Sequence, residues 1–211
     1  AGWTNANIGV SDVSPSSVAV SNNTKNYTFE GSYAIAGTGS LTKRGSGALT
    51  IANGNKFSGQ LTVESGTVAV NSVNNAGANG PLGNSALSVI LGRTGGSTGT
   101  LEYTGITAGS TKPFTLAVGG TGVFQIDAAG QKLTLGGVIS GGGDLQKTGT
   151  GTLILSGTDN YGRTTVSAGT LQFATKVSLY NSTPGSWSPG NITVESGAVF
   201  ALNVGGAGEF T

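Results

Sequence analysis

The chain has 211 residues, enough for one solenoid- or sandwich-sized domain, and charged side chains make up only 9% of it, with a net charge of +1. This balance argues against a basic nucleic-acid-binding protein and against an acidic tail. The absence of His and Cys removes the commonest general base, thiol nucleophiles, disulfide bonds and zinc-thiolate sites. No apolar run approaches the roughly 20 residues that a membrane-spanning helix needs.

The 39 glycines and 5 prolines would suit a disordered, low-complexity chain only if the sequence had no period. Here the apolar residues recur at regular spacing, and no stretch of ten or more residues combines helical periodicity with helix caps. We therefore predict a folded β protein with glycine-rich turns.

Taken in chain order, the first recognisable stretch is 10–20, where Pro15 would blunt strand pairing and could form a partial cap. The segment from Leu41 to Ile51 then returns 104 residues later, from Leu145 to Leu155. The segment 57–68 returns at 161–171 after a deletion of one residue. We predict repeat copies at 37–70 and 141–174 and a partial copy at 191–204.

Within the copies, apolar residues stand two positions apart with Thr, Gln or Lys between them, which is typical of short strands with one buried face. Glycine clusters at 141–143, 149–151 and 169 separate these strands and predict sharp corners, because glycine tolerates positive φ. The side chains that we expect to point inward are Leu49, Ile51, Val68, Leu153, Leu155 and Leu171.

Two architectures fit short strands joined by corners. A β-sandwich is favoured by the hairpin signals at Asn53-Gly54 and Asn79-Gly80. A parallel β-solenoid is favoured because it explains distant copies of a whole strand-corner-strand unit, and because stacked Thr and Ser hydroxyls form ladders where like charges would repel. We expect the solenoid.

The run from Gly137 to Tyr161, followed by 164–166 and 169–171, resembles the autotransporter-associated β-strand repeat, also called the passenger-associated transport repeat. The usual run of that family is G-x-L-x-K-x-G-x-G-T-L-x-L-S-G-x-N-x-Y, then T-T-V, then G-T-L. The copy at 37–70 matches less well, because Ala48 replaces the Thr and Val68 replaces the last Leu. The residues that carry the resemblance are Leu145, Lys147, Gly149, Gly151, Thr152, Leu153, Leu155, Tyr161, Thr164, Thr165, Val166, Gly169, Thr170 and Leu171.

The resemblance implies an all-β, right-handed parallel β-helix that is secreted or displayed at the cell surface or outer membrane of a Gram-negative bacterium. It further implies that residues 1–211 form a single solenoid fragment of a longer polypeptide. We expect a structural, non-enzymatic rod or stalk that binds no cofactor and no nucleic acid. Its expected partners are further coils of the same polypeptide or neighbouring copies placed end to end. The alternatives are an adhesin that binds surface glycans or self-associates into fibres, and a polysaccharide-active enzyme.

The candidate chemistry is sparse. The carboxylates are scattered in sequence, and we expect no catalytic residue and no metal site. Asp144 and Lys147 stand across a corner, where we interpret Lys147 and its copy Lys43 as solvated corner residues. The run from Gly141 to Asp144 is interpreted as a corner rather than a calcium-binding turn, because it occurs once.

Aromatic rings could provide a platform for a glycan. Phe57 and Tyr161 are equivalent repeat positions and are expected in the core. The longest break in the strand pattern, 181–190, contains Trp187 and is the best place for a surface contact, so Tyr180 and Trp187 are the candidates there. The other rings considered are Trp3 and Tyr103.

Overall fold

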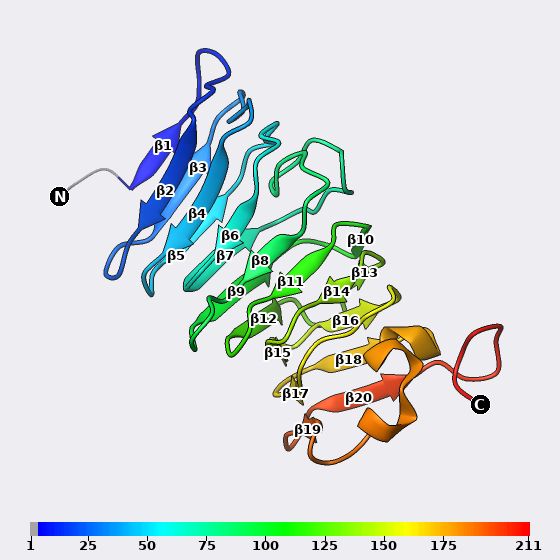
Figure 1. Cartoon of the computed structure of the whole chain (residues 1–211). Coiled ribbons are helices and arrows are strands. Elements are labelled where there is room, and N and C mark those ends of the chain that lie inside the picture. Colours follow the sequence, from blue (N-terminus) through cyan, green and yellow to red (C-terminus); the bar gives the residue numbers. More distant parts are fainter. Residues whose placement is uncertain (1–3) are drawn as a thin grey trace.

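The computed structural model describes residues 4–211 and shows a parallel β-solenoid of about seven turns (Figure 1). Its strands form three sheets of nine, six and five strands, in which every named strand pair is parallel. Parallel pairing needs a crossover between partners, so it excludes the hairpin-built sandwich. The solenoid prediction is confirmed.

The nine-stranded sheet runs the whole length of the solenoid, from the blue end to the red end of Figure 1. Its strands, in spatial order, are β1 (Asn5–Asn7), β3 (Tyr27–Glu30), β5 (Ala48–Ile51), β7 (Gly66–Val70), β9 (Thr98–Tyr103), β12 (Thr121–Ile126), β15 (Asp144–Thr148), β17 (Thr164–Val166) and β19 (Ile192–Val194).

Each of the other two sheets covers only part of the solenoid, and the two overlap where β10 and β13 alternate with β11 and β14. The six-stranded sheet belongs to the N-terminal part and contains, in spatial order, β14 (Ile139–Ser140), β11 (Phe114–Leu116), β8 (Val89–Leu91), β6 (Leu61–Val63), β4 (Ser40–Arg44) and β2 (Ser17–Ser21). The five-stranded sheet belongs to the C-terminal part and contains β10 (Ala108–Ser110), β13 (Lys132–Leu135), β16 (Thr152–Leu155), β18 (Thr170–Phe173) and β20 (Val199–Leu202). The faces that close the coil therefore change along the rod.

The core consists of inward side chains stacked from coil to coil. Leu153 pairs with Leu133 on one side and with Leu171 on the other, so aliphatic groups lie in a column along the rod. All six side chains predicted to point inward have 0% of their surface exposed. On the outer faces, equivalent positions stack polar groups, as where Thr42 pairs with Thr62.

Two segments leave the coil between neighbouring strands. We name residues 71–88, between β7 and β8, the first excursion, and residues 174–191, between β18 and β19, the second excursion. The second contains three short 3-10 turns, η1 (Lys176–Ser178), η2 (Tyr180–Ser182) and η3 (Pro184–Ser186), seen in orange in Figure 1. Within residues 4–211, none of the helical segments has the length and apolar character needed to cross a membrane.

Candidate functional site

The two repeat copies occupy different faces of the solenoid. The first copy alternates between the six-stranded sheet (β4, β6) and the nine-stranded sheet (β5, β7). The second copy alternates between the nine-stranded sheet (β15, β17) and the five-stranded sheet (β16, β18). Two similar sequences thus make equivalent corners at two places around the coil.

Each copy encloses a lysine at that corner. The Lys147 side chain is completely buried, and its Nζ donates hydrogen bonds to the carbonyl oxygens of Thr148 (2.7 Å), Gly149 (2.9 Å) and Ala168 (3.2 Å). Burial lowers the pKa of Lys147 to about 8, against a smaller raising effect from the charge of Asp127. An ammonium has three N–H donors, so these carbonyls can satisfy all of them.

Lys43 occupies the equivalent position in the first copy. It is also fully buried, and its Nζ donates to the carbonyl oxygens of Arg44 (2.7 Å), Gly45 (2.8 Å) and Ser65 (3.4 Å). The prediction that Lys43 and Lys147 are solvated corner residues is therefore wrong. In a strand of period two, Lys147 stands on the same face as the inward Leu145, so its side chain enters the core, where the corner carbonyls converge.

A third buried lysine fixes the first excursion. Lys112, between β10 and β11, donates from Nζ to the carbonyl oxygens of Gly83 (2.8 Å) and Ser85 (2.7 Å). Burial lowers the pKa of this ammonium to about 8. Sequence reasoning did not identify Lys112, although it stands in phase with the inward Ser110 and Phe114.

Glycines close the corners above these lysines. Gly149 has φ +74°, and Gly169 of the next coil has φ +62°, a region that other residues rarely adopt. A Cβ on Gly169 would collide with the carbonyl oxygens of Gly149 and Gly151 below it. The corners predicted at 141–143, 149–151 and 169 are confirmed, and at the first of them Asp144 Oδ1 accepts a hydrogen bond from the Arg163 N–H (2.7 Å).

A buried side chain in each repeat binds the preceding coil. Asn55 accepts the Ile35 N–H on Oδ1 (3.0 Å), and Asp159, its counterpart 104 residues later, accepts the Ile139 N–H on Oδ1 (2.7 Å). Both side chains have 0% exposure. The second copy thus carries a carboxyl group where the first carries an amide.

The backbone of the same two residues binds the excursion that follows each repeat. Asn55 and Gly80 exchange two backbone hydrogen bonds (2.9 and 3.0 Å). The Asp159 N–H donates to the Val177 carbonyl (3.0 Å), and the Asn181 N–H donates to the Asp159 carbonyl (2.7 Å). Position 55 and position 159 therefore link coil and excursion in the same way.

The aromatic candidates of the second excursion are largely enclosed. Tyr180 is 3% exposed, its hydroxyl donates to the Asn191 carbonyl (2.8 Å), and its ring lies 5.5 Å from that of Tyr161. This burial leaves the Tyr180 ring unavailable for the surface contact proposed from the sequence. Trp187 is half-buried, with its ring 5.5 Å from that of Phe210 and its Nε1 donating to the Leu179 carbonyl (3.2 Å).

The other aromatic candidates also lie in the core or outside the described residues. Phe57 and Tyr161 are 1% and 6% exposed, which confirms their prediction as core residues. Tyr103 is 1% exposed and therefore cannot act as a platform. Trp3 lies outside the described residues.

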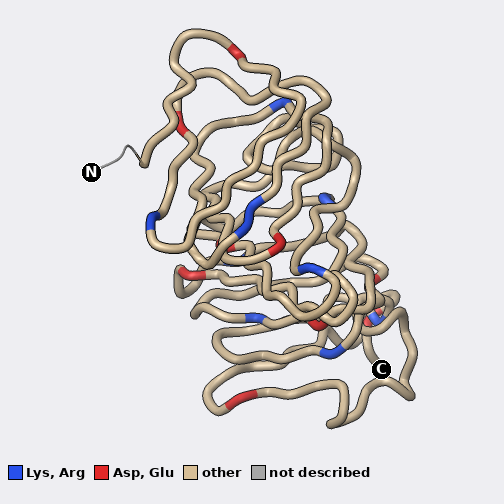
Figure 2. Tube along the Cα trace, turned by 60° about the vertical axis from the view of Figure 1, so that its left-hand side comes forward, with Lys and Arg blue, Asp and Glu red and all other residues tan. Residues whose placement is uncertain are grey.

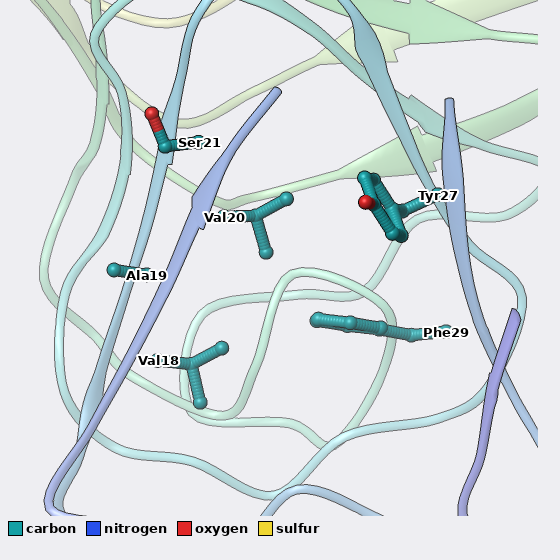
Figure 3. Close-up of a pocket in the computed structure, with 6 residues that line it drawn as sticks. All are labelled: Val18, Ala19, Val20, Ser21, Tyr27 and Phe29. Carbon is teal, nitrogen blue, oxygen red and sulfur yellow. The ribbon is translucent and has the colours of Figure 1, made fainter. Parts of the chain in front are cut away.

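An apolar hollow of about 320 Å³ opens at the N-terminal end of the rod, between β2 and β3 (Figure 3). In Figure 3 the side chains of Val18, Val20, Tyr27 and Phe29 point into it, whereas those of Ala19 and Ser21 point away. These inward side chains continue the columns of Leu41 and Leu49, with which Val18 and Tyr27 pair. Within residues 4–211, the hollow is therefore the uncovered end of the hydrophobic core.

One pair of carboxyl groups comes together across strands. Glu102 on β9 is adjacent to Gln125 on β12, and Asp127 follows two residues later. Burial raises the pKa of Glu102 to about 7, and a hydrogen bond to Asp127 and the charge of Asp127 contribute in the same direction.

Elsewhere, charged residues of both signs are interspersed along the solenoid (Figure 2). Among residues 4–211, no three or more His, Cys, Asp or Glu side chains gather into a potential metal site.

The fold and its repeated corners define a parallel β-solenoid repeat protein. The family described as Passenger-associated-transport-repeat matches residues 41–70 and 145–173, so the chain contains two such repeats and the resemblance is confirmed. The chain is 38% identical over 156 residues to "Adhesin BmaC autotransporter" of Brucella suis biovar 1 (strain 1330). That similarity covers 72% of this chain and 4% of the much longer relative. No solved structure matches the chain.

Proposed function

We propose that this chain is a non-enzymatic spacer, a stiff β-helical rod within a passenger displayed at the surface of, or secreted by, a Gram-negative bacterium. The observation that carries the proposal is the nine-stranded parallel sheet, which extends unbroken from β1 to β19. Each coil is hydrogen-bonded to the next along this sheet, so bending the rod would stretch many bonds at once. The two repeats and the autotransporter relative support export to the surface.

The distribution of chemical groups favours a structural role over catalysis. The buried ammonium groups of Lys43, Lys112 and Lys147 are each engaged by backbone carbonyls. The side chains that point into the hollow between β2 and β3 are apolar apart from the Tyr27 hydroxyl. Binding and catalytic pockets usually combine an apolar lining with a few converging polar groups, which this hollow does not do.

The two ends of the rod support continuation by further coils or by neighbouring copies. At the N-terminal end the hollow exposes the core around Val18 and Phe29. At the C-terminal end Val199 and Leu202 of β20 are 49% and 40% exposed. Uncovered strand edges beside apolar side chains are templates for pairing with another strand.

Small-angle X-ray scattering of the chain at low concentration, combined with glycan-array and host-cell binding, tests the spacer proposal. Nine strands about 4.8 Å apart make the sheet roughly 38 Å long, so we expect the scattering profile of a short rod and no saturable binding. A spherical profile, or saturable binding to a glycan or a cell surface, would contradict the proposal.

A second candidate function is adhesion, which is favoured by the name of the relative and by the partly exposed Trp187 in the second excursion. If the chain is an adhesin, Trp187→Ala should abolish binding that the wild-type chain shows. Tyr33→Ala is the matched control, because Tyr33 is 41% exposed and lies far from the second excursion in sequence. Equal binding by both variants would exclude Trp187 as the contact.

A further inference from the structure

Asp159 is a buried carboxyl group with one unsatisfied oxygen. Its Oδ1 accepts the Ile139 N–H, whereas its Oδ2 is buried without a hydrogen-bond partner. In the first repeat, the corresponding atom is the Nδ2 of Asn55, which lies 3.4 Å from Asn53 Oδ1 and 3.5 Å from the Asn53 carbonyl oxygen. An ionised Asp159 would therefore put an unpaired charge at this buried place, whereas a protonated carboxyl group carries no charge there.

The groups around Asp159 do not compensate such a charge. Tyr161, on the same coil, is close enough for the charge of Asp159 to raise its pKa, and the ring of Tyr180 on the second excursion lies 5.5 Å from that of Tyr161. Burial raises the pKa of both phenols, so they remain neutral near pH 7. Lys176, also on the second excursion, directs its ammonium to Thr211 Oγ1 (3.1 Å). Burial therefore dominates and raises the pKa of Asp159 to about 7, although the hydrogen bond from Ile139 lowers it.

The segment that Asp159 holds is under backbone strain. Tyr180, Asn181 and Ser182 have φ of +49°, +48° and +56°, a left-handed conformation that residues with a side chain adopt rarely. The Asn181 N–H is bound to the Asp159 carbonyl, as described above. This bond joins the strained turn to the backbone of Asp159, so a displacement of Asp159 large enough to break it would free the turn.

We propose that Asp159 is a proton-operated clamp: while its carboxyl group is protonated, Asp159 stays buried and its backbone holds the second excursion on the coil, and ionisation draws Asp159 towards water and releases that excursion. The excursion carries Trp187, so the exposure of this ring would follow the external pH. This inference does not depend on whether the chain is a spacer or an adhesin, because it concerns the excursion alone.

Fluorescence of Trp187 and hydrogen exchange of residues 175–191 between pH 5 and 9 test the clamp. Both are measured in a Trp3→Phe background, which removes the other tryptophan. We expect a change in Trp187 emission centred near pH 7, and excess exchange in 175–191 above that pH after correction for the intrinsic rate. Asp159→Asn, which copies the residue of the first repeat, should abolish both effects while keeping the excursion docked.

The reciprocal variant, Asn55→Asp, is the matched control. It should give the first excursion, 71–88, the same pH-dependent exchange and leave 175–191 as in the wild type. If Asn55→Asp fails to fold at neutral pH, the measurement at pH 5 still shows whether protonation rescues it. The clamp would be overturned if 175–191 exchanged equally at pH 5 and 9, or if Asp159→Asn retained the fluorescence change.

Discussion

Lys43 and Lys147 place their ammonium groups against equivalent corner carbonyls, although one corner joins β4 to β5 and the other joins β15 to β16. The two corners lie between different pairs of sheets. The lysine and the glycines beside it therefore specify the corner locally, and the position of that corner around the coil is set by the rest of the chain.

The core column around Leu153 provides a direct test of the fold. Leu153→Asp would bury a carboxylate between Leu133 and Leu171 without a partner, so we expect the chain to unfold or to lose several kcal/mol of stability. Circular dichroism melting measures the effect, with Ile154→Asp on the outward face of the same strand as control. An unchanged melting temperature for Leu153→Asp would contradict the fold.

Replacing the corner lysine tests whether it stabilises the repeat. Lys147→Met keeps the length of the side chain but leaves the carbonyls of Thr148, Gly149 and Ala168 without their donor. Each buried unsatisfied group costs about 1–3 kcal/mol, so we expect a loss of at least about 2 kcal/mol in urea unfolding. Lys132→Met, at an exposed position on β13, is the control and should change little. Equal effects of the two variants would show that the corner does not need the ammonium.

Glu102 makes stability depend on pH. Its pKa is raised to about 7 in the folded chain, above its ordinary value of 4.5, so the folded state binds a proton that the unfolded state has already lost between these values. This contribution to stability is fully present below about pH 4.5 and is lost as the pH rises through about 7.

Glu102→Gln should therefore stabilise the chain at pH 8 relative to the wild type and flatten the dependence of its unfolding free energy on pH. Since Asp159 shifts in the same direction, the comparison is made in an Asp159→Asn background. Parallel pH profiles with and without Glu102 would contradict the prediction.

Self-association tests the uncovered C-terminal end. Phe200 and Leu202 of β20 stack on Leu171 and Phe173, and β20 forms the edge of its sheet. We expect the chain to associate end to end as its concentration rises, as measured by light scattering. Ala201→Lys on β20 and Asn203→Lys directly after it should weaken this association with little effect on stability, because charges at a strand edge oppose pairing.

Thr134→Lys, on an inner strand of the same sheet, is the control and should leave association unchanged. A monomer at every concentration, for all variants, would show that the end is already covered.

The sequence predicted those parts of the structure that depend on local alternation. Leu153 and Leu155 stand two positions apart between polar neighbours, which is enough to assign their face and to predict a strand. The same alternation places Lys147 on the inward face, but its charge suggested a solvent-exposed side chain. The carbonyls that accept its hydrogen bonds come from the corner and from the next coil, so the sequence did not reveal that they compensate the buried charge. The proximity of Glu102 to Asp127 depends on strand register, which a single sequence with variable corners does not specify.

Because the second repeat is displaced by one face relative to the first, the two excursions leave the rod on different sides. The first connects the nine-stranded sheet to the six-stranded sheet, and the second connects the five-stranded sheet to the nine-stranded sheet. A polypeptide that repeated this pattern would place successive excursions at different angles around the solenoid axis. The excursions would then face several directions, so a partner could contact one of them whatever the rotation of the rod about its axis.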